Sequence, residues 1–329
     1  LTDLIGRTDL IELMEGQTPK QQKLKLDVLL SQGGIPADAP RFAQQDRNPS
    51  FDKGELAEKM VADCAPCIKS GKKKAFTYAI QNVNRSIGAR VSGEIAKAHG
   101  NAGLPDDTLH IKLLGSAGQS FGVWNAQGLT LELEGDANDY VGKGMAGGRL
   151  VIYPPKVSTF EPHRNIIVGN TCLYGATGGE LFASGMAGER FGVRNSGAFA
   201  VIEGAGDHCC EYMTGGTVIV LGDTGLNFGA GMSGGMAFVY DESEKFSTRI
   251  NHELVDASKL VGIETEPYRV FLKASIERHL ALTGSPRAQW LLDNLDAEIT
   301  KFWLVKPKRV SLEALLDDLP GAKKEAVAA

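Results

Sequence analysis

Short apolar runs recur through the middle of this chain, and a pair of small residues precedes each one. Gly197 and Gly216 are 19 residues apart, and Gly216 and Gly235 are again 19 apart. A fixed period of this length predicts structural units that bury their apolar faces by stacking on one another. The runs are Arg149–Tyr153, Glu180–Ser184, Ala198–Ile202, Thr217–Leu221 and Met236–Tyr240.

The segments between the runs also resemble one another. Ala117–Asn125 is similar to Ala187–Asn195, and Gly142–Gly148 is similar to Gly229–Gly235. Of the 40 glycines, 29 lie between residues 100 and 241, so they concentrate where the chain must turn. A strand of about five residues with tight corners makes a coil of roughly 20 residues. We therefore expect a mainly β fold, a single-stranded parallel β-helix with flanking helical segments.

Three parts are expected along the chain. Residues 1–75 form an N-terminal extended or helical linker segment, residues 76–243 the glycine-rich β-helix, and residues 244–329 a C-terminal helical cap or tail. The flanking parts lack the glycine period and carry helical signals instead.

Local signals outside the regular repeat predict further elements. Met60, Cys64 and Cys67 follow a helical period, and Pro66 kinks or shortens the last turn of that helix. Ser285 is an N-cap before proline at the first position of another helix. We expect helices over 54–69, from Pro267 to Thr283, after Ser285 and near Leu312–Leu319, strands at Ala75–Val83, Thr108–Leu114 and Phe302–Val305, and frayed residues Ala322–Ala329.

The repeat strands differ in how their two faces are patterned. Thr217–Leu221 and Arg149–Tyr153 are apolar on both faces, which predicts that flanking segments or another domain cover the outer face of the sheet. In residues 129–134, leucine alternates with Thr130, Glu132 and Glu134, so this strand should keep one face wet.

Charge and cysteine usage restrict the partners and the compartment. The net charge of −5 and the pI near 5.8 argue against a nucleic-acid partner, and no apolar run is long enough to span a membrane. Five cysteines at irregular spacing do not resemble a disulfide framework, which favours a reducing cytoplasm. A chain that begins with Leu1 suggests an excised region or a processed product.

Two glycine motifs match the dinucleotide-binding fingerprint literally. They lie at Gly142–Gly147 and Gly229–Gly234, and each is followed directly by a predicted strand. The fingerprint works only between a strand and a helix whose N-terminus holds the pyrophosphate. We therefore interpret both as corners of the repeat.

Cys64 and Cys67 form a C-x-x-C pair. Positions i and i+3 share one face of a helix, so both thiols fall on the apolar stripe of Met60, where cysteine packs as a small hydrophobe. A redox pair would need a thioredoxin-like context and a zinc site two more ligands. Packing is the favoured interpretation, with redox and metal roles as alternatives.

The remaining polar and sulfur-containing groups fit structural roles. His208, Cys209 and Cys210 adjoin a corner, and neighbours on a strand point to opposite faces, which makes a poor catalytic pair. Met145, Met213 and Met232 are expected to fill the interior. Asn138–Tyr140 and Arg194–Ser196 are expected corners whose side chains bond local backbone donors or stack as a ladder. We expect no catalytic, cofactor-binding or metal-binding residue in this chain.

Ordered blocks of the repeat resemble the C-terminal region of the glutamate synthase large subunit. The similarity covers about residues 76–243 closely and the stretch from Gly6 more loosely. The blocks are Gly115–Gly122, Gly135–Gly144, Tyr174–Gly179, Ala187–Phe191, Val193–Gly197, Glu211–Gly216 and Asn227–Gly235.

The resemblance implies a right-handed β-helix that acts as a structural element between other domains of a cytoplasmic enzyme. That enzyme makes two glutamates from glutamine and 2-oxoglutarate in nitrogen assimilation. An amidotransferase domain with an N-terminal cysteine releases ammonia, and a barrel domain with FMN and a [3Fe-4S] cluster reduces the imine. In bacteria a small subunit with FAD passes electrons from NADPH. The implied partners are the other large-subunit domains and the small subunit.

This sequence lacks the parts of the family that carry chemistry. It does not begin with cysteine, and Cys64 and Cys67 have no third cysteine nearby. The expected role is therefore a non-catalytic element that positions the amidotransferase and synthase domains. The alternatives are a subunit of a complex like formylmethanofuran dehydrogenase, a polysaccharide-acting β-helix protein, and a thiol redox module built on that cysteine pair.

Overall fold

The computed structural model describes residues 54–316 without a gap. Before them it describes residues 10–12, 18–23, 34, 36, 38–40, 42 and 44–46. The chain divides into two units, Leu1–Asp52 and Lys53–Ala329, of which the first contains a single described turn of 3-10 helix, η3 (Gln21–Lys23). Much of the predicted linker before residue 54 and all of the frayed C-terminus lie outside the described residues, and the division into three parts stays a prediction.

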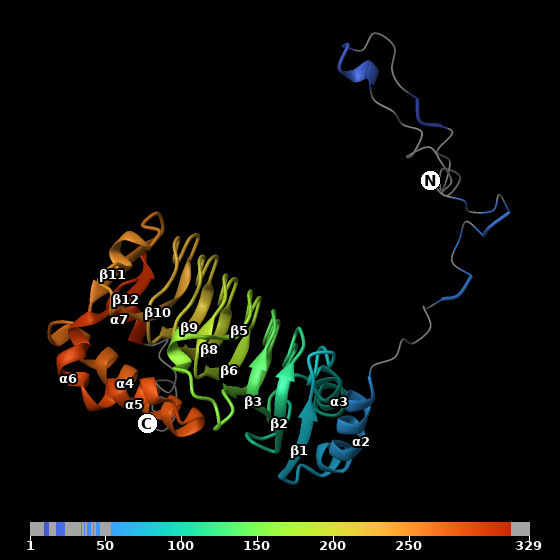
Figure 1. The fold of residues 1–329 in the computed structure, drawn as a ribbon, viewed down its shortest axis with the longest axis horizontal. Coiled ribbons are helices and arrows are strands. Elements are labelled where there is room, and N and C mark those ends of the chain that lie inside the picture. Colours follow the sequence, from blue (N-terminus) through green and yellow to red (C-terminus); the bar gives the residue numbers. More distant parts are fainter. Residues whose placement is uncertain are drawn as a thin grey trace. The chain divides into compact units, whose positions relative to one another are not determined.

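The second unit is built on one mixed sheet of 12 strands (Figure 1). Eight strands pair in parallel in the order of the sequence. They are β1 (Lys74–Ile80), β2 (Leu109–Ala117), β3 (Leu129–Ala137), β4 (Ala146–Tyr153), β6 (Gly178–Ala183), β8 (Ser196–Ile202), β9 (Thr214–Val220) and β10 (Gly234–Tyr240).

Four further strands complete the sheet. The strand β12 (Phe302–Pro307), expected from its apolar run, pairs antiparallel with β10 and with β11 (Val255–Lys259). The short strands β5 (Ile166–Val168) and β7 (Met186–Ala187) form a second parallel ladder beside β3. The parallel stack therefore ends in an antiparallel pair.

Equivalent residues of successive repeats are paired with each other across adjacent strands of the sheet. On the inner face Leu131 pairs with Leu150, which pairs with Leu181. Leucines at these positions have no exposed surface and belong to one apolar cluster that extends through all the parallel strands. The predicted stacking of repeats around a shared core is confirmed, and Met145, Met213 and Met232 lie in that core as expected.

The corners between strands are joined from repeat to repeat by backbone hydrogen bonds. The amide of Tyr140 donates to Asn170 O at 2.9 Å, and the amide of Thr171 donates to Glu189 O at 2.8 Å. Side chains add to this ladder, since Asn170 Oδ1 accepts from the Glu189 amide at 2.8 Å.

Of the expected corners, Asp139 Oδ1 accepts from the Asn170 amide of the next repeat at 2.8 Å, so the ladder runs from side chain to backbone and not between stacked asparagines. Asn195 Oδ1 accepts from the local amides of Gly197 and Ala198, as predicted.

Positive φ at the corners does not belong to glycine alone. One corner position has φ between 58° and 63° in six successive repeats, and none of the six residues is glycine. The hydrogen bonds to both neighbouring repeats hold this conformation, which costs an isolated L-residue about 1–2 kcal/mol. The six residues are Ser120, Tyr140, Thr171, Arg190, His208 and Asn227.

Helices cover the outer face of the sheet where that face is apolar. Along one outer column the residues change from Lys112 and Glu132 to Val151, and then to Phe182 and further apolar side chains. The apolar part packs against α4 (Glu266–Thr283) and α5 (Pro286–Asp293), which lie beside β6 to β10 (Figure 1). The predicted cover is confirmed, since the side chains of residues 218–221 are all fully buried.

The first end of the stack is closed by two helices. The helix α2 (Glu55–Ser70) confirms the prediction over 54–69, although it continues past Pro66. Its partner α3 (Ala89–His99) was not predicted, and it places Val91 and Ile95 in the shared core. The remaining elements are η4 (Gly100–Ala102), η5 (Pro162–Arg164), η6 (Phe246–Thr248), η7 (Ile263–Thr265), α6 (Leu295–Glu298), η8 (Ile299–Lys301) and α7 (Leu312–Leu316).

Close approach of backbones explains the glycines at the starts of β4, β6, β8, β9 and β10. A Cβ at Gly234 would lie 2.1 Å from Thr214 O of the preceding repeat. Gly234→Ala should therefore lower the free energy of unfolding by about 2–3 kcal/mol. Gly93→Ala is the control, because a Cβ there meets nothing within 4 Å and should stabilise α3 by about 0.5–1 kcal/mol. Urea unfolding measures both, and a neutral Gly234→Ala would contradict the tight stacking.

The strained corners make the opposite prediction for glycine. Thr171 is β-branched and has φ of 58°, so Thr171→Gly should raise the free energy of unfolding by about 1 kcal/mol. Thr177 is exposed and does not have positive φ. Thr177→Gly should therefore lower the free energy of unfolding by about 0.5–1 kcal/mol. Equal losses in the two variants would show that the corner conformation is not strained.

Candidate functional site

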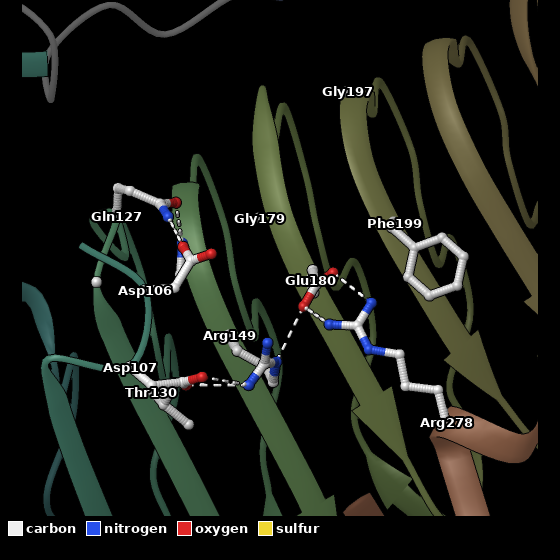
Figure 2. A pocket seen from close by; sticks show the side chains of 12 residues that line it. Asp106, Asp107, Gln127, Thr130, Arg149, Gly179, Glu180, Gly197, Phe199 and Arg278 are labelled. Carbon is white, nitrogen blue, oxygen red and sulfur yellow. Dashed lines mark hydrogen bonds and ion pairs between the residues drawn. The ribbon is translucent and has the colours of Figure 1, made fainter. Parts of the chain in front are cut away.

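A charged cleft opens on the outer face of the sheet, where the helical cover stops. It has a volume of about 530 Å³ and lies over the starts of β3, β4, β6 and β8, with Arg278 of α4 at one side (Figure 2). Phe199 is its one aromatic lining residue. The other lining residues are Asp106, Asp107, Gln127, Gly128, Thr130, Gly148, Arg149, Gly179, Glu180 and Gly197.

A chain of ion pairs crosses this cleft. Arg149 Nη1 lies 3.0 Å from Asp107 Oδ1, and Arg149 Nε lies 2.9 Å from Glu180 Oε2. Arg278 Nη1 donates to Glu180 Oε1 at 2.6 Å, which ties α4 to the sheet. A hydrogen bond from Thr130, followed by the charge of Arg149, lowers the pKa of Asp107. Asp107 is therefore charged at neutral pH, and both Asp107 and Glu180 are already paired with arginines.

A second network continues along β2 and β3. His110 Nε2 lies 2.7 Å from Glu132 Oε2, and Lys112 Nζ lies 3.1 Å from Glu134 Oε2. The hydrogen bond from His110, with a further one from Tyr153, lowers the pKa of Glu132 to about 2. Glu132 and Glu134 keep part of their surface exposed, as the alternating pattern predicted, whereas Thr130 is buried beside Asp107.

The charged groups of this region are paired with one another. A general acid at neutral pH needs a carboxyl group with a raised pKa, and here the shifts of Asp107 and Glu132 go the other way. Burial and then Glu132 raise the pKa of Tyr153, so its phenol stays protonated. The network presents fixed charges of both signs without an activated nucleophile among its members.

The cysteine pair is part of the core. Cys64 and Cys67 are buried on α2 with Met60, in the apolar cluster that the repeats share. Burial is the main cause that raises the pKa of Cys64 to about 12, which disfavours its thiolate. The packing interpretation of the pair is confirmed.

The group at residues 208–210 differs in geometry from the expectation. Cys209 and Cys210 lie in a turn and not on a strand, and φ of Cys210 is 59°. Both thiols point into the core, with their Sγ atoms 3.8 Å apart. Alternation across a strand was the wrong rule for this corner, because it belongs to extended backbone. His208 contacts Asn227 at 3.0 Å, within the corner ladder.

The glycine fingerprints lie at corners, as predicted. The first is followed by β4 and the second by β10, with no helix after either motif. Sequence reasoning missed a buried cluster, in which Glu203 Oε1 accepts from Ser285 Oγ and lies 3.1 Å from His279 Nε2. These residues are 76 and 82 positions apart from Glu203, and only the packing of α4 and α5 on the sheet brings them together.

The donor atoms do not fit an iron–sulfur cluster. Within the described residues no group of three His, Cys, Asp or Glu side chains is placed to hold a metal ion. The cysteines lie in the core at separate sites, apart from the pairs 64/67 and 209/210. Among the described helices, none combines the length and the apolar character needed to cross a bilayer.

Similarity to known proteins agrees with this architecture. The glutamate synthase [NADH] of Schizosaccharomyces pombe is 43% identical over 99% of this chain, which corresponds to 15% of that protein. The glutamate synthase [NADPH] large chain of Azospirillum brasilense is 44% identical over 94% of the chain and 20% of its own length. The ferredoxin-dependent glutamate synthase 2 of Synechocystis is 44% identical over 93% of the chain and 20% of its own length. The chain spans a fifth or less of these curated relatives.

The fold is a stack of parallel strands that share one apolar core, with glycine-rich corners and with paired charges on the outer face. The chain belongs to the GXGXG motif family, whose model matches residues 55–308. The resemblance to glutamate synthase noted from the sequence is confirmed.

The network on β2 and β3 predicts a pH dependence of stability. A carboxylate whose folded pKa is lowered stabilises the fold above its unfolded pKa and loses that contribution as the pH falls toward the folded value. We therefore expect Glu132 to contribute about 1–3 kcal/mol that disappears between roughly pH 5 and pH 2. Urea unfolding should show a shallower acid loss in Glu132→Gln than in the parent. Glu189→Gln, at an exposed corner, is the control, and an identical acid loss in Glu132→Gln and the parent would refute the assignment.

Proposed function

We propose that this chain is a non-catalytic region of a glutamate synthase large subunit, folded as a right-handed β-helix. The observation that carries the proposal is the coverage: nearly the whole chain matches only 15–20% of each relative. Such a region is one part of a much longer polypeptide. Parallel connections of this kind are right-handed in the great majority of cases, which supports the proposed handedness.

The stiffness of the stack supports a positioning role. One apolar core extends through every repeat, and helices close one end and cover one face. Close-packed interiors transmit displacement and are not easily compressed. A rod of this kind keeps the amidotransferase and synthase domains of the proposed enzyme at a fixed separation and angle.

The whole enzyme would form two glutamates from glutamine, 2-oxoglutarate and reductant in the cytoplasm. FMN and a [3Fe-4S] cluster would be held by other domains, because the cysteines here are core residues. The small subunit with FAD and NADPH is a proposed partner of the enzyme and not of a site in this chain. In the cleft, Asp107 and Glu180 are paired with arginines and Asp106 accepts a hydrogen bond from Gln127, which supports the absence of catalytic and cofactor-binding residues.

Coupling between the two half-reactions tests this role. The 329-residue chain alone should neither hydrolyse glutamine nor aminate 2-oxoglutarate. In the full-length enzyme, Gly234→Ala should raise the glutamine hydrolysed per 2-oxoglutarate consumed, because the stack at Thr214 is disturbed. Each half-reaction assayed with its own substrate should keep its rate.

The control for this experiment is Gly93→Ala in the full-length enzyme, which should keep the ratio of glutamine to 2-oxoglutarate unchanged. Activity of the isolated chain in either assay would reject the non-catalytic role. Equal loss of both half-reactions in Gly234→Ala, in an enzyme that still folds, would reject the positioning role.

A further inference from the structure

Aromatic and cationic side chains form a stripe along one set of corners. We call Trp124, Tyr140, Lys143, Tyr174, Arg194 and Tyr212 the corner stripe. Backbone hydrogen bonds place its members on adjacent repeats: the Trp124 amide donates to Lys143 O at 2.9 Å, and the Arg194 amide donates to Glu211 O, next to Tyr212, at 2.9 Å. At about 4.8 Å per repeat, the stripe is roughly 20 Å long.

Four members of the stripe, Tyr140 among them, have positive φ, and the other three share a corner position at which other repeats have glycine. Trp124, Arg194 and Tyr212 have φ of 54°, 54° and 53°. The equivalent position in the other repeats is Gly144, Gly175 or Gly231, with φ between 60° and 67°. An L-residue costs about 1–2 kcal/mol more than glycine in this region.

The exposed rings recover little of that cost inside this chain. Trp124 is 63% exposed and Tyr212 is 53% exposed. Each lies over the glycine of the next repeat, since a Cβ at Gly144 would meet Trp124 Cδ1 at 2.9 Å and a Cβ at Gly231 would meet Tyr212 Cδ1 at 2.4 Å. Hydrogen bonds between repeats hold these residues at positive φ, as at the other corners, but they do not explain why large exposed rings stand where glycine would fit, which points to a function outside the fold.

The cations of the stripe lack ionic partners in the described part of the chain. Lys143 Nζ lies 5.3 Å from the ring centre of Tyr140 and 5.8 Å from that of Tyr174, and Arg194 lies 6.0 Å from that of Tyr212. No described carboxylate lies within 4.0 Å of either cation. By contrast, the neighbouring Arg190 pairs with Glu211 at 2.6 Å.

We propose that the corner stripe is the surface on which the remainder of the same polypeptide docks. This inference rests on the proposed function, because the relatives are five to seven times longer than this chain. Tryptophan, tyrosine and arginine dominate the energetically important centres of protein interfaces. Four of the ten tryptophan and tyrosine residues in the chain lie on this stripe. The docked segment offers carboxylates to Lys143 and Arg194 and apolar groups to the rings.

Photocrosslinking in the full-length enzyme tests the location. Benzoylphenylalanine in place of Tyr212 should crosslink within one polypeptide to peptides outside these 329 residues. The control places the same probe at Ile263, which is 90% exposed and lies away from the stripe in η7. A crosslink yield from position 212 that is equal to or lower than the yield from position 263 would overturn the proposal. Crosslinks only to a second copy of the chain would overturn it as well.

A charge reversal adds an independent measurement. Lys143→Glu with Arg194→Glu should lower the crosslink yield from position 212 by about tenfold, because the carboxylates of the docked segment would be repelled.

Trp124→Gly should also lower the crosslink yield from position 212. The same substitution should raise the midpoint temperature of thermal unfolding, because glycine relieves the backbone strain. An unchanged yield in the charge-reversed enzyme contradicts the stripe as the docking surface. If Gly234→Ala still uncouples the half-reactions in that case, the positioning role stands and only its docking surface is wrong.

Discussion

Close backbone contact between successive repeats is the constraint on which this structure depends. At the starts of β6, β9 and β10 a glycine lies so near the carbonyl of the preceding repeat that a Cβ at Gly178, Gly215 or Gly234 would lie 2.1–2.7 Å from that oxygen. This contact brings the strands into parallel register and aligns the inner leucines into one column. The corners then bond to both neighbours, and those bonds hold non-glycine residues at positive φ. Core, register and strain follow from the same packing.

The outer face of the sheet is apolar in one part and charged in another. One column of equivalent positions changes from Lys112 and Glu132 to Val151 and Phe182 along the stack. Where it is apolar, α4 and α5 bury it, and Arg278 links that cover to Glu180. Where it is charged, Lys112 and Glu132 pair with each other, and the lowered pKa of Glu132 keeps that carboxylate charged. The arrangement gives a stiff element with a polar surface, which agrees with a positioning role better than with catalysis.

Much of the fold could be predicted from the sequence, because period and alternation are local signals. The stacked repeats, the covered outer face, the helix at α2 and the strand at β12 all follow from spacing and apolar pattern. The cleft could not be predicted, since Asp107, Arg149 and Arg278 come together only through the register and the docking of α4. The non-glycine residues at positive φ could not be predicted for a physical reason: glycine is the default in that region, but hydrogen bonds between repeats hold Thr171 and Cys210 there as well.

Native-state hydrogen exchange at the corners tests the shared core most directly. The amides of Tyr140, Thr171 and Arg190 each donate to the next repeat. Because one core extends through all the repeats, these three amides should exchange only through global unfolding and with the same free energy. Free energies that differ from repeat to repeat, or exchange near the rate of an unstructured chain, would contradict a single cooperative stack.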